Sequence, residues 1–131
     1  MIVVDASALL EVLLNTPNAP PVAERIFDPR ETLHAPHLLD VEVAQVLRRY
    51  VLAGHIESAR GAEALADLAD LPLTRYPHAV LLQRIWELRN NVSAYDAAYL
   101  ALAEALGATL VTRDSTLGAV PGFSGRVEVI P

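Results

Sequence analysis

Residues 2–10 read IVVDASALL and carry the strongest indication of the fold. The apolar run Ile2 to Val4 predicts a buried strand, Asp5 and Ser7 indicate a turn, and the alanine and leucines that follow predict a helix. A strand that passes directly into a helix is typical of open α/β sheets, where ligands bind at the carboxyl ends of the strands. Asp5 therefore stands where a binding site is expected.

The rest of the chain alternates between strand and helix patterns. Further strands are expected at residues 31–35, 71–75, 108–112 and 127–130, the last of them at an edge. Helical patterns cover residues 7–14, 21–27, 38–53, 58–68, 79–89 and 93–106. Such alternation predicts an α/β fold of three layers, α/β/α, around a central and mostly parallel sheet. The strands that begin at residues 2 and 108 are expected to be neighbours across the switch point.

Composition narrows the classes of protein to consider. The chain has 131 residues, of which 53% are hydrophobic, and no linker or repeat divides it, so one domain over residues 1–131 is expected. The absence of cysteine excludes thiolate nucleophiles and Cys-based metal sites. No lysine is present, which excludes receiver domains and P-loop proteins. No signal peptide or bilayer-length apolar run is visible, so a cytoplasmic protein is expected.

The net charge of -6 argues against a protein that binds nucleic acid passively through a basic face. An acidic enzyme that recruits cations is compatible with it. Four acids, Asp5, Glu42, Asp96 and Asp114, fall where strand or helix ends would direct them into one pocket. Carboxylates gathered in this way repel one another unless a divalent cation lies between them.

Each of these acids also has a purely structural interpretation. Asp5 is a good helix N-cap, and Glu42 near a helix start is favoured by the helix dipole. Asp96 follows Ser93 by three residues, as in a capping box, and Asp114 suits a turn after a strand. The coincidence of all four, and the expected pairing of the strands before Asp5 and Asp114, favours a functional site.

Other candidates are weaker. His34 and His37 suggest a metal pair, but Pro36 between them and their position at a strand end favour surface or capping roles. Trp86 is expected in the core or at an interface rather than as a platform for base stacking. No serine has the histidine and third partner that acyl transfer requires.

Four segments, taken together, resemble the acid-bearing blocks of a PIN domain. They are DASAL at residues 5–9, EVAQVL at 42–47, YDAAYLALA at 95–103 and LVTRD at 110–114. The resemblance runs from residue 1 to about residue 130, and the length of the chain suits the bacterial toxins called VapC. The main departure is Gln45, where relatives often carry asparagine.

The resemblance implies a divalent-metal-dependent endoribonuclease, using Mg²⁺ or Mn²⁺, that cleaves single-stranded or structured RNA. Its metal-binding and catalytic acids would be Asp5, Glu42, Asp96 and Asp114, with Ser7 and Thr112 as supporting hydroxyls. Arg113 is a candidate phosphate contact. The resemblance further implies a toxin–antitoxin pair with a small VapB-like antitoxin, and a homodimer.

Two other functions remain open at this point. One is a PIN-like module that has lost catalysis and binds only RNA or a protein, although the presence of all four acids counts against it. The other is a metal-dependent phosphatase, because the same carboxylates would support hydrolysis of a small phosphate ester.

Overall fold

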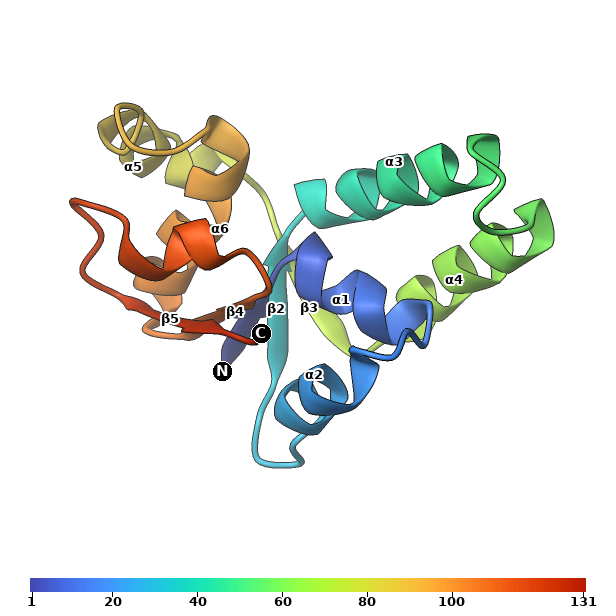
Figure 1. Ribbon diagram of the computed structural model, residues 1–131. Helices are drawn as coiled ribbons and strands as arrows, with labels where there is room; N and C mark the ends of the chain where they lie inside the picture. Colours follow the sequence, from blue (N-terminus) through green and yellow to red (C-terminus); the bar gives the residue numbers. More distant parts are fainter.

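Five strands form one sheet in the computed structural model, which describes residues 1–131 (Figure 1). They are β1 (Ile2–Val4), β2 (Leu33–Pro36), β3 (Leu73–Tyr76), β4 (Thr109–Thr112) and β5 (Arg126–Val129). Their order is β3-β2-β1-β4-β5, and every pair is parallel. The expected pairing of β1 with β4 is confirmed, with Val4 opposite Val111. The carboxyl ends of these two central strands therefore meet.

Six α-helices and two short 3₁₀-helices connect the strands. They are α1 (Ala6–Leu13), α2 (Ala19–Ile26), α3 (Leu38–Leu52), α4 (Ser58–Asp70), η1 (Ala79–Leu81), α5 (Leu82–Glu87), α6 (Ala94–Leu106) and η2 (Ser115–Ala119).

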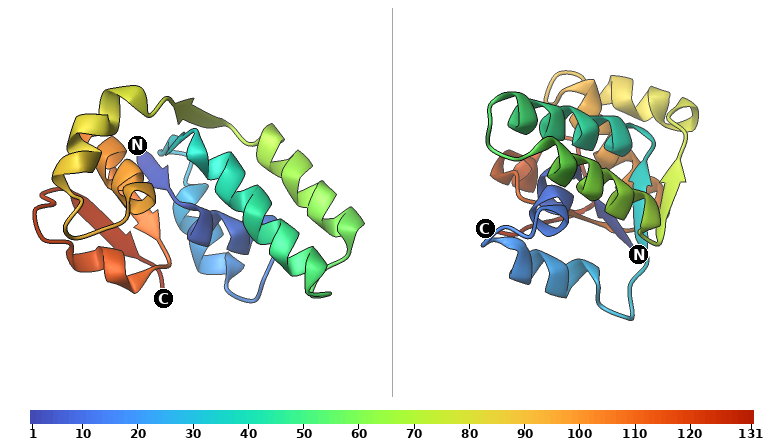
Figure 2. Two further views of the ribbon diagram at one scale, coloured as in Figure 1. Left: turned by 90° about the horizontal axis from the view of Figure 1, so that it is seen from above. Right: turned by 90° about the vertical axis from the view of Figure 1, so that its right-hand side faces the viewer.

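The helices cover both faces of the sheet, as the sequence predicts. The chain crosses from β1 to β3 in one direction and from β3 to β5 in the other. Right-handed crossovers then put the first four helices on one face and α5 and α6 on the opposite face. Figures 1 and 2 show this division, with the sheet between the two groups. The three-layer α/β/α prediction is confirmed.

Burial on both faces explains the composition of the central elements. Ile2, Val3 and Val4 are all fully buried, so β1 lacks the alternation of a half-exposed strand. In α6 every residue from Ala97 to Ala103 is buried, and its many alanines allow the helix to pack closely on the sheet. No helix of the structure combines the length and apolar character needed to cross a membrane.

Several element boundaries differ from those expected. Helix α2 begins at Ala19 rather than residue 21, because Pro20 and Pro21 both fit the first turn, where no N–H is needed. Strand β3 begins at Leu73 rather than residue 71, because Leu71 is the extended cap of α4. The segment 79–89 divides into η1 and the short α5.

The structure decides the environments of two side chains for which the sequence left alternatives open. His34 is buried rather than on the surface, with its ring nitrogens 2.8 Å from Thr32 Oγ1 and 2.7 Å from Tyr76 Oη. Burial lowers the pKa of His34. Trp86 is 68% exposed, which excludes it from the core, and the Arg89 guanidinium lies 4.7 Å from its ring centre.

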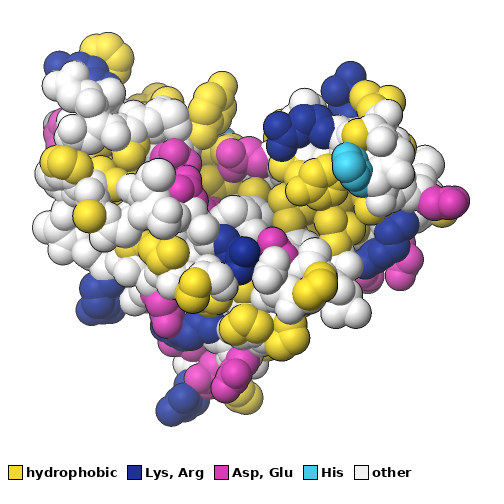
Figure 3. Space-filling view, viewed as in Figure 1, with side chains coloured by type: hydrophobic (Ala, Val, Ile, Leu, Met, Phe, Trp, Pro, Cys, Tyr) yellow, Lys and Arg dark blue, Asp and Glu magenta, His cyan; other side chains and the backbone are white.

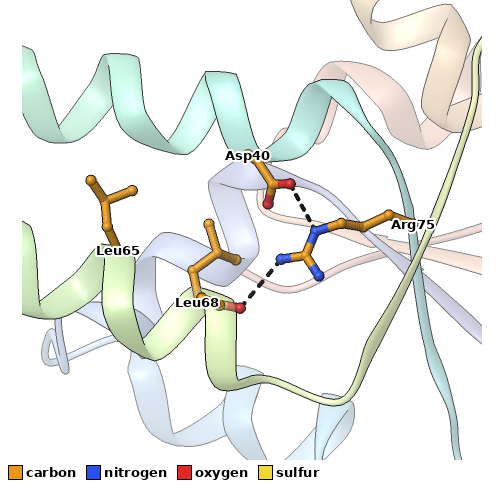
Figure 4. A pocket seen from close by; sticks show the side chains of 5 residues that line it. Asp40, Leu65, Leu68 and Arg75 are labelled. Carbon is orange, nitrogen blue, oxygen red and sulfur yellow. Dashed lines mark hydrogen bonds and ion pairs between the residues drawn. The ribbon is translucent and has the colours of Figure 1, made fainter.

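Arg75 on β3 ties together the three elements around it (Figure 4). Its Nε donates to Asp40 Oδ2 over 2.8 Å, and its two terminal nitrogens donate to the carbonyls of Leu68 and Leu73. The other carboxyl oxygen of Asp40 is buried without a partner. Since Asp40 is in the first turn of α3, two residues before Glu42, this ion pair holds the helix start directly before the turn that carries Glu42. It lines a hollow of about 370 Å³ to which none of the four acids contributes.

We expect Arg75→Met to lower the free energy of unfolding by about 1–2 kcal/mol, because it leaves the Asp40 carboxylate without its partner and removes the guanidinium donors to two carbonyls. Urea unfolding of the two proteins measures the difference. The double variant Asp40→Asn with Arg75→Met is the control, because it also removes the unpaired carboxylate charge. It should recover part of the lost free energy of unfolding. An unchanged unfolding midpoint in Arg75→Met would show that the ion pair adds nothing to the packing of α3.

Candidate active site

The four acids predicted from the sequence stand at the carboxyl edge of the sheet. Asp5 follows β1 and Asp114 follows β4, while Glu42 lies in the second turn of α3, which begins after β2. Asp96 is in the first turn of α6, and a helix that crosses back over a parallel sheet begins at the same edge. Figure 3 shows acidic side chains in the notch between the α5–α6 part of the molecule and α3.

Electrostatic effects link these acids to one another. Burial raises the pKa of Asp5, and the charge of Asp114 raises it further. Burial raises the pKa of Glu42, with a smaller contribution from Asp5 and then from Asp96. Burial likewise raises the pKa of Asp96, to which Asp114 and Asp5 add. Folding thus brings together carboxylates whose charges oppose one another.

Asp5 is the most buried of the four and is held on both oxygens. Ser7 Oγ donates to Asp5 Oδ1 over 2.7 Å, and the Ala8 N–H donates to the same oxygen over 3.1 Å. The Thr112 hydroxyl donates to Asp5 Oδ2. Oδ1 is saturated by two donors, whereas Oδ2 keeps one lone pair. The carboxylate is therefore oriented with one acceptor position free.

The two hydroxyls are themselves fixed by the backbone that follows β4. The Arg113 N–H donates to Ser7 Oγ over 3.0 Å, and the Asp114 N–H donates to Thr112 Oγ1 over 3.0 Å. Each hydroxyl thus accepts from the backbone and directs its own proton to Asp5. Ser7 and Thr112 are close to Asp5 as the sequence-based hypothesis requires, and their catalytic role remains a prediction.

Glu42 has a partner that the sequence analysis missed. Tyr99 is 2% exposed and its hydroxyl donates to Glu42 Oε1 over 2.5 Å. Burial raises the pKa of Tyr99, and the bond to Glu42 raises it further, so the phenol keeps its proton and acts as a donor. The available signal was spacing, since Tyr99 follows Asp96 by three residues on α6 and so faces the same way.

The structural interpretations of the acids hold alongside the functional one. Asp5 caps α1, and Asp114 Oδ1 accepts from both the N–H and the hydroxyl of Thr116. Ser93 Oγ accepts from the Asp96 N–H over 3.2 Å. Capping by Asp5 and Asp114 uses Oδ1 of each and leaves acceptor capacity on Oδ2. A cap and a ligand can therefore be the same residue.

The Arg113 side chain forms its contacts with residues outside the group of four acids. Its Nε lies 3.5 Å from Glu11 Oε1, and one terminal nitrogen donates to the carbonyl of Pro131 over 2.8 Å. The guanidinium is therefore tied to α1 and to the segment after β5, so a phosphate contact would require it to leave Glu11. A role as a phosphate ligand remains a prediction.

The donor set of the site suits a hard divalent cation. It consists of carboxylate oxygens alone, and the mutual repulsion of the acids is relieved by positive charge. No three acidic or histidine side chains form a preformed metal-binding group in the structure. Ion binding would therefore require rotation of the less constrained acids, Glu42, Asp96 and Asp114, around the fixed Asp5.

Comparison with known proteins agrees with this geometry. Residues 2–122 match the PIN domain family model. A VapC ribonuclease of Mycobacterium bovis is 47% identical over 131 residues, which covers 100% of this chain and 99% of that protein. This chain belongs to the VapC ribonucleases of the PIN-domain family.

Solved structures share the fold of this PIN domain. One is VapC20 of Mycobacterium tuberculosis, described as a Sarcin-Ricin loop cleaving toxin, with a TM-score of 0.73, 20% identity and full coverage of both chains. Another is VapBC2 of Rickettsia felis bound to a DNA fragment from its promoter, with a TM-score of 0.72, 15% identity and full coverage of both chains. At these identities the likeness is one of fold.

The raised pKa of Asp96 allows a test of the repulsion between Asp96 and the neighbouring acids. The pKa of Asp96 in the folded chain lies above the ordinary value of 3.8. At pH values above 3.8, the folded metal-free chain therefore binds more protons than the unfolded chain. Ionisation of Asp96 therefore costs stability, progressively from about pH 4 up to the raised pKa.

We expect Asp96→Asn in chelator to melt at or above the wild-type temperature at pH 7, with the difference vanishing near about pH 4. Differential scanning fluorimetry across this range measures it. Groups with lowered pKa values, such as Asp28 and Glu31, act equally in both proteins and cancel. Asp67→Asn, at an exposed acid of α4, is the control. A variant that melts several degrees below wild type at pH 7 would show that Asp96 serves the helix start.

Proposed function

We propose that this PIN domain is an endoribonuclease that cleaves single-stranded or looped RNA with the aid of Mg²⁺ or Mn²⁺ held by Asp5, Glu42, Asp96 and Asp114. The observation that carries the proposal is the position of these acids, which come from four separate elements and stand together at the carboxyl edge of the sheet. The charges of Asp5, Asp96 and Asp114 raise the pKa values of their acidic neighbours there. The names of the full-length relatives support the reaction type. An RNA substrate also favours the cytoplasm as the place of action.

The chemistry follows from what a bound ion supplies. A divalent ion held by these carboxylates would lower the pKa of a water molecule and neutralise charge on the phosphate and on the leaving oxygen. In this proposal Asp5, Asp96 and Asp114 hold the principal ion, and Glu42 occupies a second position or orients the attacking water.

The chain's own contacts would keep this arrangement in order. Ser7 and Thr112 keep Asp5 in one orientation, which fixes the position of its free acceptor on Oδ2. Tyr99 donates to one oxygen of Glu42 and leaves the other for water or metal. Asp5, held in this way, would need little reorganisation during the reaction. The notch above them is open, which suits a flexible strand better than a small, enclosed substrate (Figure 3).

We expect Asp5→Asn to keep the fold but to lower RNA cleavage by roughly 100-fold or more, because the change keeps the shape and removes one ligand charge. Chelator should abolish cleavage by wild type, and added Mn²⁺ should restore it. A gel assay with labelled single-stranded RNA measures the rates, and circular dichroism checks the fold. Asp70→Asn, at the exposed end of α4, is the control and should cleave like wild type.

The same assay distinguishes the other functions. Cleavage that survives in chelator would contradict the metal mechanism. Binding of RNA without cleavage, in the presence of Mn²⁺, would indicate a silent module. Hydrolysis of a generic phosphate ester with intact RNA would indicate a phosphatase.

We also propose that a small VapB-like antitoxin binds this chain and that the chain forms a homodimer. The exposed apolar side chains Leu52, Val80, Leu82 and Trp86, each at least 58% exposed, support the proposal because such surface is usually covered by partners. The fold shared with VapBC complexes is compatible with it.

We expect the chain to co-purify with the product of an adjacent small reading frame, and expression of the chain alone to slow growth. Pull-down with a tag on the chain and growth curves measure the two effects. Expression of Asp5→Asn alone should be harmless while the association persists, because the variant changes the site and not the surface. Wild-type chain that expresses freely, without toxicity or association, would contradict the toxin–antitoxin assignment.

A further inference from the structure

A groove of about 330 Å³ begins at Glu42 and runs along α3 away from the acids. Its lining residues are Val41, Glu42, Gln45, Val46, Arg49 and Tyr95. Glu42, Gln45, Val46 and Arg49 have the spacing i, i+3, i+4 and i+7, so they form one stripe along the helix. The groove is therefore continuous with the proposed active site through a shared residue.

Aromatic and apolar groups form part of this groove. Tyr95 is 67% exposed and Val41 is 72% exposed, and Tyr95 immediately precedes Asp96 at the start of α6. An exposed tyrosine ring beside a nuclease site is a surface on which an unstacked base can lie. A volume near the lower end of known ligand sites suits a single base rather than a duplex.

Two polar side chains of the groove have no partner within the protein. The side chains of Gln45 and Arg49 make no hydrogen bond or ion pair, and among the arginines only Arg48 is equally free. Basic side chains stand on the α3 side of the acidic notch (Figure 3). A free guanidinium can bind a phosphate, and a free amide can bind the edge of a base. The aromatic ring beside them can stack on the face of that base.

We propose that this groove binds one unstacked nucleobase of the RNA, stacked on Tyr95 and read at its edge by Gln45, with Arg49 at the adjoining phosphate. The inference rests on the proposed ribonuclease function and adds a specificity-determining subsite to it. Gln45 is placed at the Hoogsteen edge of the base, where an amide, with one donor and one acceptor, matches N6 and N7 of adenine, whereas guanine presents two acceptors there. Adenine is therefore the expected base.

The substrates for the test are short single-stranded oligouridines that carry one adenine, guanine or cytosine, incubated with wild type and Mn²⁺. Wild type should cleave near the adenine roughly tenfold faster than at the corresponding position in the other substrates. Gln45→Ala should remove this ratio while still cleaving RNA. A structural role for Gln45 would lower all rates together and leave the ratio intact.

Binding to the cleavage-deficient Asp5→Asn chain separates recognition from chemistry. In this background Tyr95→Ala should weaken binding of the adenine oligonucleotide by roughly tenfold, measured by fluorescence anisotropy. Arg49→Ala should weaken binding of all the oligonucleotides and reduce its salt dependence. Arg48→Ala is the matched charge control, because Arg48 faces the groove between α3 and α4, and Gln83→Ala is the matched amide control on α5.

Cleavage of all the substrates at the same rate by wild type would overturn the subsite, and so would a Gln45→Ala chain that keeps the wild-type preference for adenine. Neither result would contradict the ribonuclease function. No cleavage of any RNA by wild type would instead contradict the ribonuclease function itself. A change of oligomeric state in Tyr95→Ala, with the base ratio unchanged, would show that the groove contacts protein and would also overturn the subsite.

Discussion

The buried carboxylate of Asp5 is the constraint on which the rest of the site depends. It lies directly after a strand that has no exposed residue, and its burial opposes the charged form and raises its pKa. Three donors offset part of that cost, and two of them, Ser7 and Thr112, are held by the backbone after β4. The pairing of β1 with β4 is therefore both the centre of the sheet and the support of the first acid.

The other three acids add electrostatic repulsion, which the packing of the hydrophobic core offsets. Glu42, Asp96 and Asp114 approach Asp5 although like charges oppose this, and no basic side chain pairs with any of them. A core of 30 buried residues, with α6 packed on the sheet, holds the elements that carry them. In the proposed function, a cation bound among these acids would gain from the relief of their repulsion.

Helix α3 connects two parts of the molecule with different tasks. Its first turn is bound through Asp40 to Arg75, which also contacts the end of α4. Its second turn carries Glu42, and the stripe that continues from Glu42 forms the groove of Gln45 and Arg49. A displacement of the helix start would therefore move an acid and the proposed base subsite together. In the proposed function, catalysis and recognition would share this one helix.

The fold class, most of the elements and the four candidate acids could be predicted from the amino-acid sequence. The local patterns were strong: an apolar strand that ends in Asp5, a helix that ends at Gly107 with a positive φ of 63°, and a switch point that joins β1 to β4. Such features depend on neighbouring residues and on general rules of handedness, which a sequence displays directly.

Only the tertiary structure decided the contacts between distant segments. Tyr99 with Glu42, Arg75 with Asp40, and the burial of His34 against Tyr76 join residues 57, 35 and 42 positions apart. The tie of Arg113 to Glu11 and the exposure of Trp86 likewise depend on which faces the elements present to one another. Side-chain partners of this kind are set by packing across the sheet, and hydrophobic periodicity carries no information about them.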